Sequence, residues 1–147
     1  MLDGKDIKIL KELKRNGRLS AQEISKITGI PVTTVFNRVK RMEKSKAIKG
    51  YTVVLDEGRV GRNVAAYVSI TVDYNLLKRK RISQQQLATK LRQHEFVDEV
   101  DMITGASDIV VKIRTHDISQ LNEFVTKYLR NVDGVERTQT SVILEAF

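Results

Sequence analysis

The segment from Ser20 to Lys46 constrains the fold more than any other part of this 147-residue chain. Ser20 and Glu23 have the spacing of a capping box, in which each side chain bonds the backbone N–H of the other residue, so a helix is expected to begin there. Gly29 supplies the left-handed conformation that commonly ends a helix. A second helix is indicated by a buried stripe at intervals of four and three residues, formed by Val35, Val39 and Met42. The segment is therefore predicted to be two short helices joined by a tight turn.

The opposite face of the second helix is polar and basic. It consists of Thr33, Thr34, Asn37, Arg38, Lys40, Arg41 and Lys44. Two helices joined in this way, with such a face on the second, indicate a helix-turn-helix whose second helix lies in the major groove of DNA. In that position the N-terminal side chains reach base edges and the later ones approach phosphates.

Position along the second helix suggests a role for each candidate DNA-binding residue. The candidates for base-edge contacts, with methyl groups that suit the thymine methyl, are Val32, Thr33 and Thr34. Asn37 is suited to adenine, and Arg38 to guanine or a phosphate. The candidates for phosphate neutralisation are Lys40, Arg41 and Lys44. For Arg38 an alternative stays open, because an arginine at a helix–helix corner can instead bridge to a carboxylate such as Glu12 or Glu23.

Basic residues are concentrated in the first part of the chain. Residues 1–60 hold 14 Lys/Arg and 7 Asp/Glu, whereas residues 61–147 hold 12 and 11, so most of the net charge of +8 lies in the first part. A basic part joined to a nearly neutral one is typical of a nucleic-acid-binding domain attached to a domain of another kind. A solvated basic surface is the alternative explanation.

The composition also excludes several kinds of chemistry. The chain has no cysteine, which removes disulfides, thiolate catalysis and zinc-finger sites. Its two histidines, His94 and His116, are expected on the surface, with no further ligand for a metal and no nucleophile at a catalytic spacing. We therefore expect no enzyme activity, no metal and no cofactor. No apolar run reaches the roughly 18 residues of a membrane span, and no signal peptide is evident, so a cytoplasmic protein is expected.

Elements on both sides of the helix-turn-helix complete the expected first domain. Asp3 is suited to cap a first helix that continues to about Arg15, and Asp6 favours the dipole of that helix. Apolar residues alternate from Ile48 to Leu55, which predicts a strand that serves as a wing and as a linker. We place the boundary near residue 60, which gives a DNA-binding domain at 1–60 and a second domain at 61–147.

The second domain has the element order β-α-β-β-α-β. Strands are predicted at 64–72, 97–103, 109–113 and 135–144. Ser83 and Asp117 are suited to cap the two helices, and the basic run from Lys78 to Arg81 is expected in a loop. This order is the ferredoxin-like arrangement. The predicted fold class is therefore α+β, with an N-terminal winged helix-turn-helix and a C-terminal ferredoxin-like βαββαβ domain.

One face of the predicted sheet is left without helices. From the first strand it carries Ala65, Tyr67, Ser69 and Thr71. Small and mildly polar residues suit either water or a second sheet. Because a helix-turn-helix commonly binds a two-fold operator as a dimer, we expect this domain to form a homodimer, with a solvated face as the alternative.

Short motifs in both halves resemble the Lrp/AsnC family, the feast/famine transcription regulators. In the first half these are Leu2-Asp3-Gly4-Lys5-Asp6, Ile9-Leu10, Asn16-Gly17-Arg18, Gly29-Ile30, Thr34-Val35, Arg38-Val39, Arg41-Met42 and Ile48-Lys49-Gly50-Tyr51. In the second half they are Thr104-Gly105-Ala106-Ser107-Asp108, at the family's G-x-x-D turn, and Val135-Glu136-Arg137-Thr138-Gln139-Thr140. The resemblance covers essentially the whole chain, with the same order and spacing.

The resemblance implies a DNA-binding regulator that dimerises through its second domain and assembles further into tetramers or octamers. It also implies amino-acid effectors near the G-x-x-D turn. The candidate effector-binding residues are Gly105, Ala106, Ser107, Asp108, Thr138 and Thr140. Asp108 could pair with the effector's amine, and backbone N–H groups at Gly105 could bind its carboxylate. The alternative is a tight β-turn in which Asp108 satisfies the local backbone.

Three positions depart from the family pattern. Family members often have an aromatic residue where this chain has Ser107, which bears on the identity of an effector. They commonly have serine where this chain has Pro31, and proline offers no capping hydroxyl. The segment from Asn75 to Ile82 looks longer and more basic than usual, and either contacts DNA or is a charged solvent loop.

These observations leave one main function and one alternative. The main prediction is a sequence-specific DNA-binding transcriptional regulator modulated by an amino acid. The alternative is a sequence-tolerant architectural protein that coats DNA without a small-molecule effector. Equal affinity for operator and random DNA, at matched counterion release, would favour the alternative.

Overall fold

The computed structural model describes residues 1–145, which form two compact units. The first unit is Met1–Val54, and the second begins at Leu55. Among residues 1–145, none of the helices has the length and apolar character needed to cross a bilayer.

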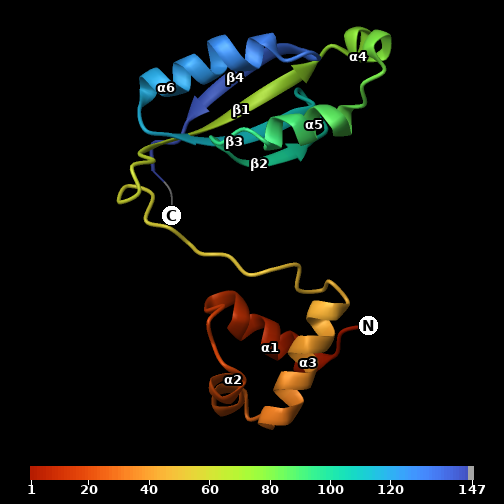
Figure 1. The fold of residues 1–147 in the computed structure, drawn as a ribbon, viewed down its shortest axis with the longest axis vertical. Helices are drawn as coiled ribbons and strands as arrows, with labels where there is room; N and C mark the ends of the chain where they lie inside the picture. Colours follow the sequence, from red (N-terminus) through yellow and green to blue (C-terminus); the bar gives the residue numbers. More distant parts are fainter. Residues whose placement is uncertain (146–147) are drawn as a thin grey trace. The chain divides into compact units, whose positions relative to one another are not determined.

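The first unit is a three-helix domain built around the predicted helix-turn-helix (Figure 1). Its helices are α1 (Gly4–Arg15), α2 (Ala21–Thr28) and α3 (Val32–Lys44). The buried core side chains come from all three helices and the α2–α3 turn: Ile9, Ile24, Ile30, Val35 and Met42. Val39 packs against them, so the predicted apolar stripe of α3 is confirmed.

The ends of these helices follow the predicted capping rules. Ser20 and Glu23 form the capping box of α2, and Gly29 ends that helix with φ of 72°. Asp3 and Asp6 form a second capping box at α1. Pro31 precedes α3 and makes no side-chain cap bond, as expected for a residue without a hydroxyl.

The predicted strand from Ile48 to Leu55 is wrong. Within residues 1–145 this segment has no strand partner, and it is not a strand. Instead Ile48 N–H donates to the carbonyl of Met42, and the Tyr51 hydroxyl donates to Glu43 at 2.8 Å, so its first residues fold back onto α3. Alternating apolar residues are compatible with a strand, but a strand also needs a partner backbone to accept and donate hydrogen bonds.

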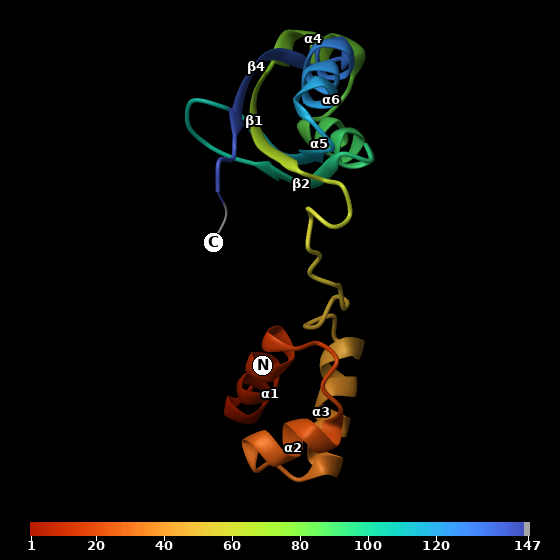
Figure 2. The same ribbon diagram turned by 90° about the vertical axis from the view of Figure 1, so that its left-hand side faces the viewer.

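The second unit is a four-stranded antiparallel sheet with helices on one face (Figure 2). Its strands are β1 (Val64–Val72), β2 (Val97–Met102), β3 (Ile109–Thr115) and β4 (Val135–Val142), in the spatial order β2-β3-β1-β4. The covering helices include α5 (Gln84–Arg92) and α6 (Ile118–Glu123). This order and pairing confirm the ferredoxin-like prediction.

The core of the second unit lies between the sheet and these helices. Alternate residues of β1 are buried there: Ala66, Val68, Ile70 and Val72. Leu87 and Leu91 pack from α5, as predicted from their spacing. On the opposite face, Tyr67 of β1 is 43% exposed. The alternation of β1 therefore sets one buried and one open face.

Two segments differ from the predicted elements. The basic run was expected in a loop, but its first three residues lie in a short helix, α4 (Tyr74–Lys80), and Arg81 follows as the C-cap. Asp73 caps it by accepting from Leu76 N–H, and Leu77 is buried in the core. After α6 the chain continues through a π-helical turn, Phe124–Tyr128, and a 3₁₀ turn, Leu129–Asn131.

The prediction that both histidines lie on the surface is wrong for His94. Its ring is partly buried among three aromatic rings, with centroids 4.7 Å from Phe124 and 4.4 Å from Tyr128. Its Nδ1 accepts from Phe96 N–H at 3.2 Å. Burial lowers the pKa of His94, so the neutral ring is favoured. His116 is exposed, as predicted.

Candidate DNA-binding surface and effector turn

The outer face of α3 is defined by its rotation away from the buried Val35. Since an α-helix turns by about 100° per residue, four side chains lie within about 40° of the direction opposite Val35. These are Thr33, Asn37, Lys40 and Lys44, and all four are exposed. We call them the outer face of α3. It combines a hydroxyl, an amide and two ammonium groups on a helix that its core contacts hold rigidly.

The other predicted DNA-binding residues flank this face. Val32 is 38% exposed at the first turn, and Thr34 is partly buried. Arg41 is exposed, whereas Arg38 is partly buried on the side of α3 that meets α1. The structure therefore brings all eight candidates onto one helix, with the two arginines at its edge.

Both arginines bind carboxylates at the start of α1. Arg38 Nη1 donates to Asp3 at 2.6 and 2.7 Å and to Asp6 Oδ1 at 2.8 Å. Arg41 Nη2 donates to Asp6 Oδ2 at 2.7 Å. The alternative of a carboxylate partner for Arg38 is thus realised, but through these two aspartates rather than Glu12 or Glu23. A base or phosphate contact by Arg38 stays a prediction.

These contacts lower the pKa of both carboxyl groups. The hydrogen bond from Arg38 is the main cause that lowers the pKa of Asp3 from 3.8 to about 2. The pKa of Asp6 is lowered chiefly by the backbone N–H of Asp3, and then by Arg38. The same hydrogen bonds raise the pKa of Arg38. Asp3, Asp6 and Arg38 are therefore charged at neutral pH.

Sequence reasoning missed Phe36, an aromatic residue beside the outer face. Phe36 is 50% exposed, and the Nζ of Lys40 lies 4.5 Å from its ring centroid. The ring attracts the ammonium group and restricts its position. The signal in the sequence was the i,i+4 spacing of an aromatic and a lysine on a helix already assigned to DNA.

The turn from Gly105 to Asp108 joins β2 and β3 and projects away from the helices (Figure 2). Gly105 has φ of 128°, which favours glycine, and it is exposed together with Ala106. Ser107 and Asp108 are partly buried. The backbone at Gly105 is therefore open to a ligand.

Asp108 fixes this turn to β1 and α4. Its Oδ2 accepts from Val72 N–H and its Oδ1 accepts from the Tyr74 hydroxyl, both at 2.8 Å. The bond to Asp108 raises the pKa of Tyr74. Asp108 thus serves the backbone of a distant strand, not that of its own turn. Its Oδ1 lies at the exposed Tyr74 side chain.

Thr138 and Thr140 lie on a different strand from the turn. They pair with Ile70 and Val68 of β1, so they share the face that the helices cover. β1 separates β4 from β3, which places Thr138 about 10 Å, two strand spacings, from the strand that follows the turn. One chain by itself does not bring these threonines and the turn into contact.

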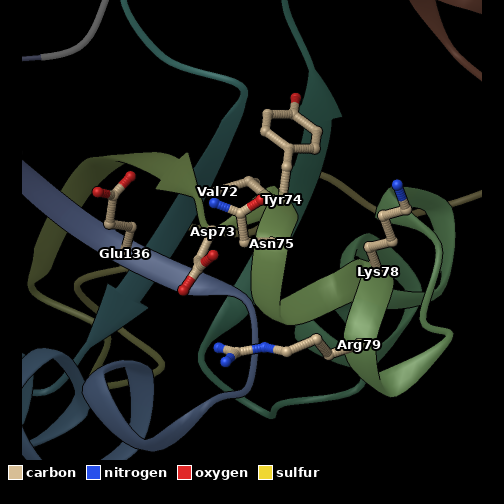
Figure 3. Close-up of a pocket in the computed structure, with 7 residues that line it drawn as sticks. All are labelled: Val72, Asp73, Tyr74, Asn75, Lys78, Arg79 and Glu136. Carbon is tan, nitrogen blue, oxygen red and sulfur yellow. The ribbon is translucent and has the colours of Figure 1, made fainter.

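A hollow of about 880 Å³ lies where β1 ends and α4 begins, and sequence reasoning missed it because α4 was expected to be a loop. Its lining comes from the end of β1, from α4 and from β4 (Figure 3). The lining side chains are Val72, Asp73, Tyr74, Asn75, Lys78, Arg79 and Glu136. Glu136 is the extra residue of a β-bulge, since Thr71 pairs with Arg137 and Val72 with Val135.

A helix-turn-helix with a polar and basic second helix, joined to a ferredoxin-like domain with an open turn, defines a DNA-binding regulator of two-domain type. Comparison with known families agrees. A model described as winged helix-turn-helix DNA-binding matches residues 2–49, and one described as the Lrp/AsnC ligand binding domain matches residues 65–147. The chain belongs to the Lrp/AsnC family of transcriptional regulators.

Individual relatives span nearly the whole chain. The HTH-type transcriptional regulator FL11 of Pyrococcus furiosus is 36% identical over 99% of this chain and 91% of its own length. The leucine-responsive regulatory protein of Haemophilus influenzae is 32% identical over 98% and 84%. A transcriptional regulator of Neisseria meningitidis, solved as a complex with L-methionine, is 26% identical over 99% and 91%, with a TM-score of 0.88.

Proposed function

We propose that this chain binds specific DNA sites through α3 and that an amino acid modulates this binding through the second domain. The observation that carries the proposal is the outer face of α3, where exposed hydroxyl, amide and ammonium groups stand opposite a buried apolar stripe. The domain assignment of 1–60 for DNA and 61–147 for dimerisation and effector binding is supported by the two family matches.

On this proposal the residues of α3 divide into two roles. Base edges are contacted by Val32, Thr33, Thr34 and Asn37, which lie in the first half of the helix. Phosphates are contacted by Lys40, Arg41 and Lys44, which follow in the second half. Arg38 lies at the edge of the face, where its carboxylate partners favour a phosphate over a base.

The test begins with selection of bound sites from genomic fragments, with and without a pool of amino acids. Asn37→Ala and Lys44→Ala are then compared on a selected site and on random DNA. Asn37→Ala should cost about 1–3 kcal/mol on the selected site and little on random DNA. Lys44→Ala should weaken both alike and reduce the salt slope by about 0.9. Failure to enrich any site, with equal affinity for all DNA, would favour the architectural alternative.

For the effector we propose the turn from Gly105 to Asp108, together with Thr138 and Thr140, at a site where dimers meet in the larger assemblies. The support is the open backbone at Gly105, the exposed side of Asp108, and the solved complex of the Neisseria meningitidis regulator with L-methionine. An effector amine would pair with Asp108 Oδ1 beside Tyr74, and its carboxylate would accept from the turn N–H groups.

The effector proposal is tested with Asp108→Asn, which keeps an acceptor for Val72 N–H and removes the charge that pairs with an amine. The variant should fold, bind DNA, and lose any amino-acid-dependent change in DNA affinity. Glu123→Gln, which removes an exposed charge on α6 outside the turn, should keep the response. A retained response in Asp108→Asn would place the effector elsewhere.

The remaining parts of the proposal concern assembly and setting. We propose a homodimer through the open face of the sheet, with tetramers or octamers as larger assemblies, acting without enzymatic chemistry on cytoplasmic DNA. Residues 1–145 contain no group of three or more His, Asp and Glu side chains arranged to hold a metal. Sedimentation of the intact protein across a concentration series tests the assembly.

A further inference from the structure

The carboxylate of Asp6 is completely buried between α1 and α3, although Asp6 is charged. It accepts from Asp3 N–H at 2.9 Å, from Arg38 at 2.8 Å and from Arg41 at 2.7 Å. A buried charge is costly unless it is paired and hydrogen-bonded, and here both oxygens are satisfied by charged donors. Capping of α1 alone would need neither arginine.

We propose that Asp3 and Asp6 are positioning residues that hold the guanidinium groups of Arg38 and Arg41 as a pair of clamps for the DNA backbone. This inference rests on the proposed DNA-binding function. We call these four residues the carboxylate–arginine clamp. Each arginine would then bridge a protein carboxylate on one edge and a DNA phosphate on the other.

The donors that remain on each guanidinium group make this arrangement possible. The carboxylates occupy Nη1 of Arg38 and Nη2 of Arg41. Within residues 1–145 no acceptor lies at hydrogen-bond distance from the other N–H groups of these two side chains. A guanidinium group has five N–H donors in a planar fork, so its second edge matches the two oxygens of a phosphate. The side chain of Arg41 is 57% exposed and that of Arg38 20%.

The position of the clamp on α3 favours phosphates over bases. Counting about 100° per residue, Arg41 lies about 60° and Arg38 about 120° from the centre of the outer face. Side chains at the centre of a recognition helix point at the floor of the major groove, and those at its flank face the groove wall, which is the phosphate backbone. The carboxylates stabilise this flank orientation, since they draw both side chains toward α1.

The direction in which one charge change alters DNA affinity distinguishes this proposal from a general electrostatic attraction. Replacing Asp3 by Asn raises the net charge of the first unit by one, which alone would strengthen binding to DNA. The clamp predicts the opposite, because Arg38 loses the partner that orients it. Asparagine caps a helix about as well as aspartate, so α1 should keep its N-terminal hydrogen bonds.

The experiment measures binding of the full chain to a random-sequence duplex over a series of salt concentrations. The variants are Asp3→Asn and Asp6→Asn, and the matched control is Glu12→Gln, which removes an acid of α1 that pairs with Arg15. Loss of one phosphate contact reduces the salt slope by about 0.9, which is about tenfold in affinity near 0.1 M salt. For Asp3→Asn we expect the salt slope and the affinity to fall by these amounts. For Asp6→Asn we expect about twice that change in salt slope. Glu12→Gln should bind DNA as tightly as the parent or tighter.

A double-variant background separates positioning from folding. The Asp6→Asn change is also made in a protein in which Arg38 and Arg41 are both alanine. If Asp6 acts through the arginines, the change should cause no further loss of DNA affinity in that protein. An equal loss in both backgrounds would mean that Asp6 only stabilises the fold, and the proposal would fail. If Asp6→Asn does not fold, Asp3→Asn decides by itself.

The result that overturns the clamp is Asp3→Asn binding as tightly as the parent, or tighter, with an unchanged salt slope. That outcome leaves the proposed function intact, since the parent still binds DNA. Absence of salt-dependent binding by the parent chain would instead overturn the proposed function.

Discussion

Asp3 joins local and tertiary structure in a single side chain. Its carboxylate accepts from Lys5 N–H and Asp6 N–H at the start of α1 and also binds Arg38 of α3. The capping role follows from neighbouring residues and was predictable. The ion pair joins residues 35 apart in the chain, so it appears only once α1 and α3 are packed together.

This residue gives the first unit an acid-dependent stability. The pKa of Asp3 in the folded chain is about 2, below the 3.8 of an unpaired carboxyl, so the unfolded chain binds more protons between these values. Stability is therefore full above about pH 4 and is lost as pH falls toward 2. We expect the urea midpoint for unfolding of residues 1–54 to drop between about pH 4 and pH 2. The NMR signals of the backbone amides in these residues measure that midpoint. Asp3→Asn should make the drop smaller, and an equal drop in the variant would contradict the assignment.

His94 gives the second unit a pH dependence in a different range. Burial lowers its pKa, so the unfolded chain binds more protons just below about pH 6.5, and stability is lost as pH falls through that region. His94→Asn can keep an acceptor for Phe96 N–H but cannot be protonated, so the variant should lose this dependence. Thermal unfolding of the second unit between pH 7.5 and 5 measures it. The exposed His116→Asn is the control, and its curve should match the parent.

At the scale of single residues, the sequence predicts functions that depend on neighbours in the chain. Ser20, Gly29 and Ser83 cap their helices as expected because a cap is defined within four residues. The burial of Asp6 and of His94 was not predictable. Each is set by side chains from other elements, which sequence spacing does not bring together.

At the scale of elements, the strands were predicted more accurately than the connections. β1 has the predicted bounds because alternating apolar residues over nine positions leave little ambiguity. α4 was hidden because four consecutive basic residues suggest solvent, and a helix of seven residues shows only one buried position, Leu77. Its cap, Asp73, was the available signal.

The packing of α4 against the turn before β4 leads to a third prediction. Gly134 has φ of 95°, and a Cβ there would overlap the Leu77 side chain and lie 3.2 Å from Leu87 Cδ2. Gly134→Ala should therefore destabilise the second unit by about 2–4 kcal/mol, from overpacking and from the left-handed conformation. Denaturant unfolding measures the change. Gly58→Ala, which meets only ordinary contacts, should change stability by less than about 1 kcal/mol, and similar values for the two variants would contradict this packing.

The segment from Ile48 to Leu55 shows the limit of pattern at this scale. Its side chains alternate as in a strand, and Val53 and Val54 are 73% and 99% exposed. A single chain offers these residues neither a core nor a backbone partner within residues 1–145. The pattern predicts a preference for extended backbone, and only a partner can turn that preference into a strand.

At the scale of the whole molecule, the open face of the sheet connects DNA binding to assembly. It is lined by side chains of three strands, among them Tyr67, Ser69, Val110, Lys112 and Gln139. Lys112 Nζ lies 5.9 Å from the Tyr67 ring centroid, and the two residues paired with Ser69, which are Val110 and Gln139, are uncharged. Charged side chains of β2, β3 and β4 lie on the same face around this centre, so a second sheet that packs there would have to pair these charges or leave them hydrated at its margin.

Our last prediction follows from that face. Ser69→Arg places a long charged side chain at its centre, beside Val110 and Gln139, so a dimer formed there should dissociate. Sedimentation velocity should show a monomer for the variant and a dimer for the parent. Affinity for a site with two half-sites should also fall, because linked binding of two first units is lost. Gln85→Arg, an exposed change on α5, adds the same charge on the helix-covered side and should leave both properties unchanged. A dimer of undiminished stability in Ser69→Arg would show that this face is solvated and that the subunits meet elsewhere.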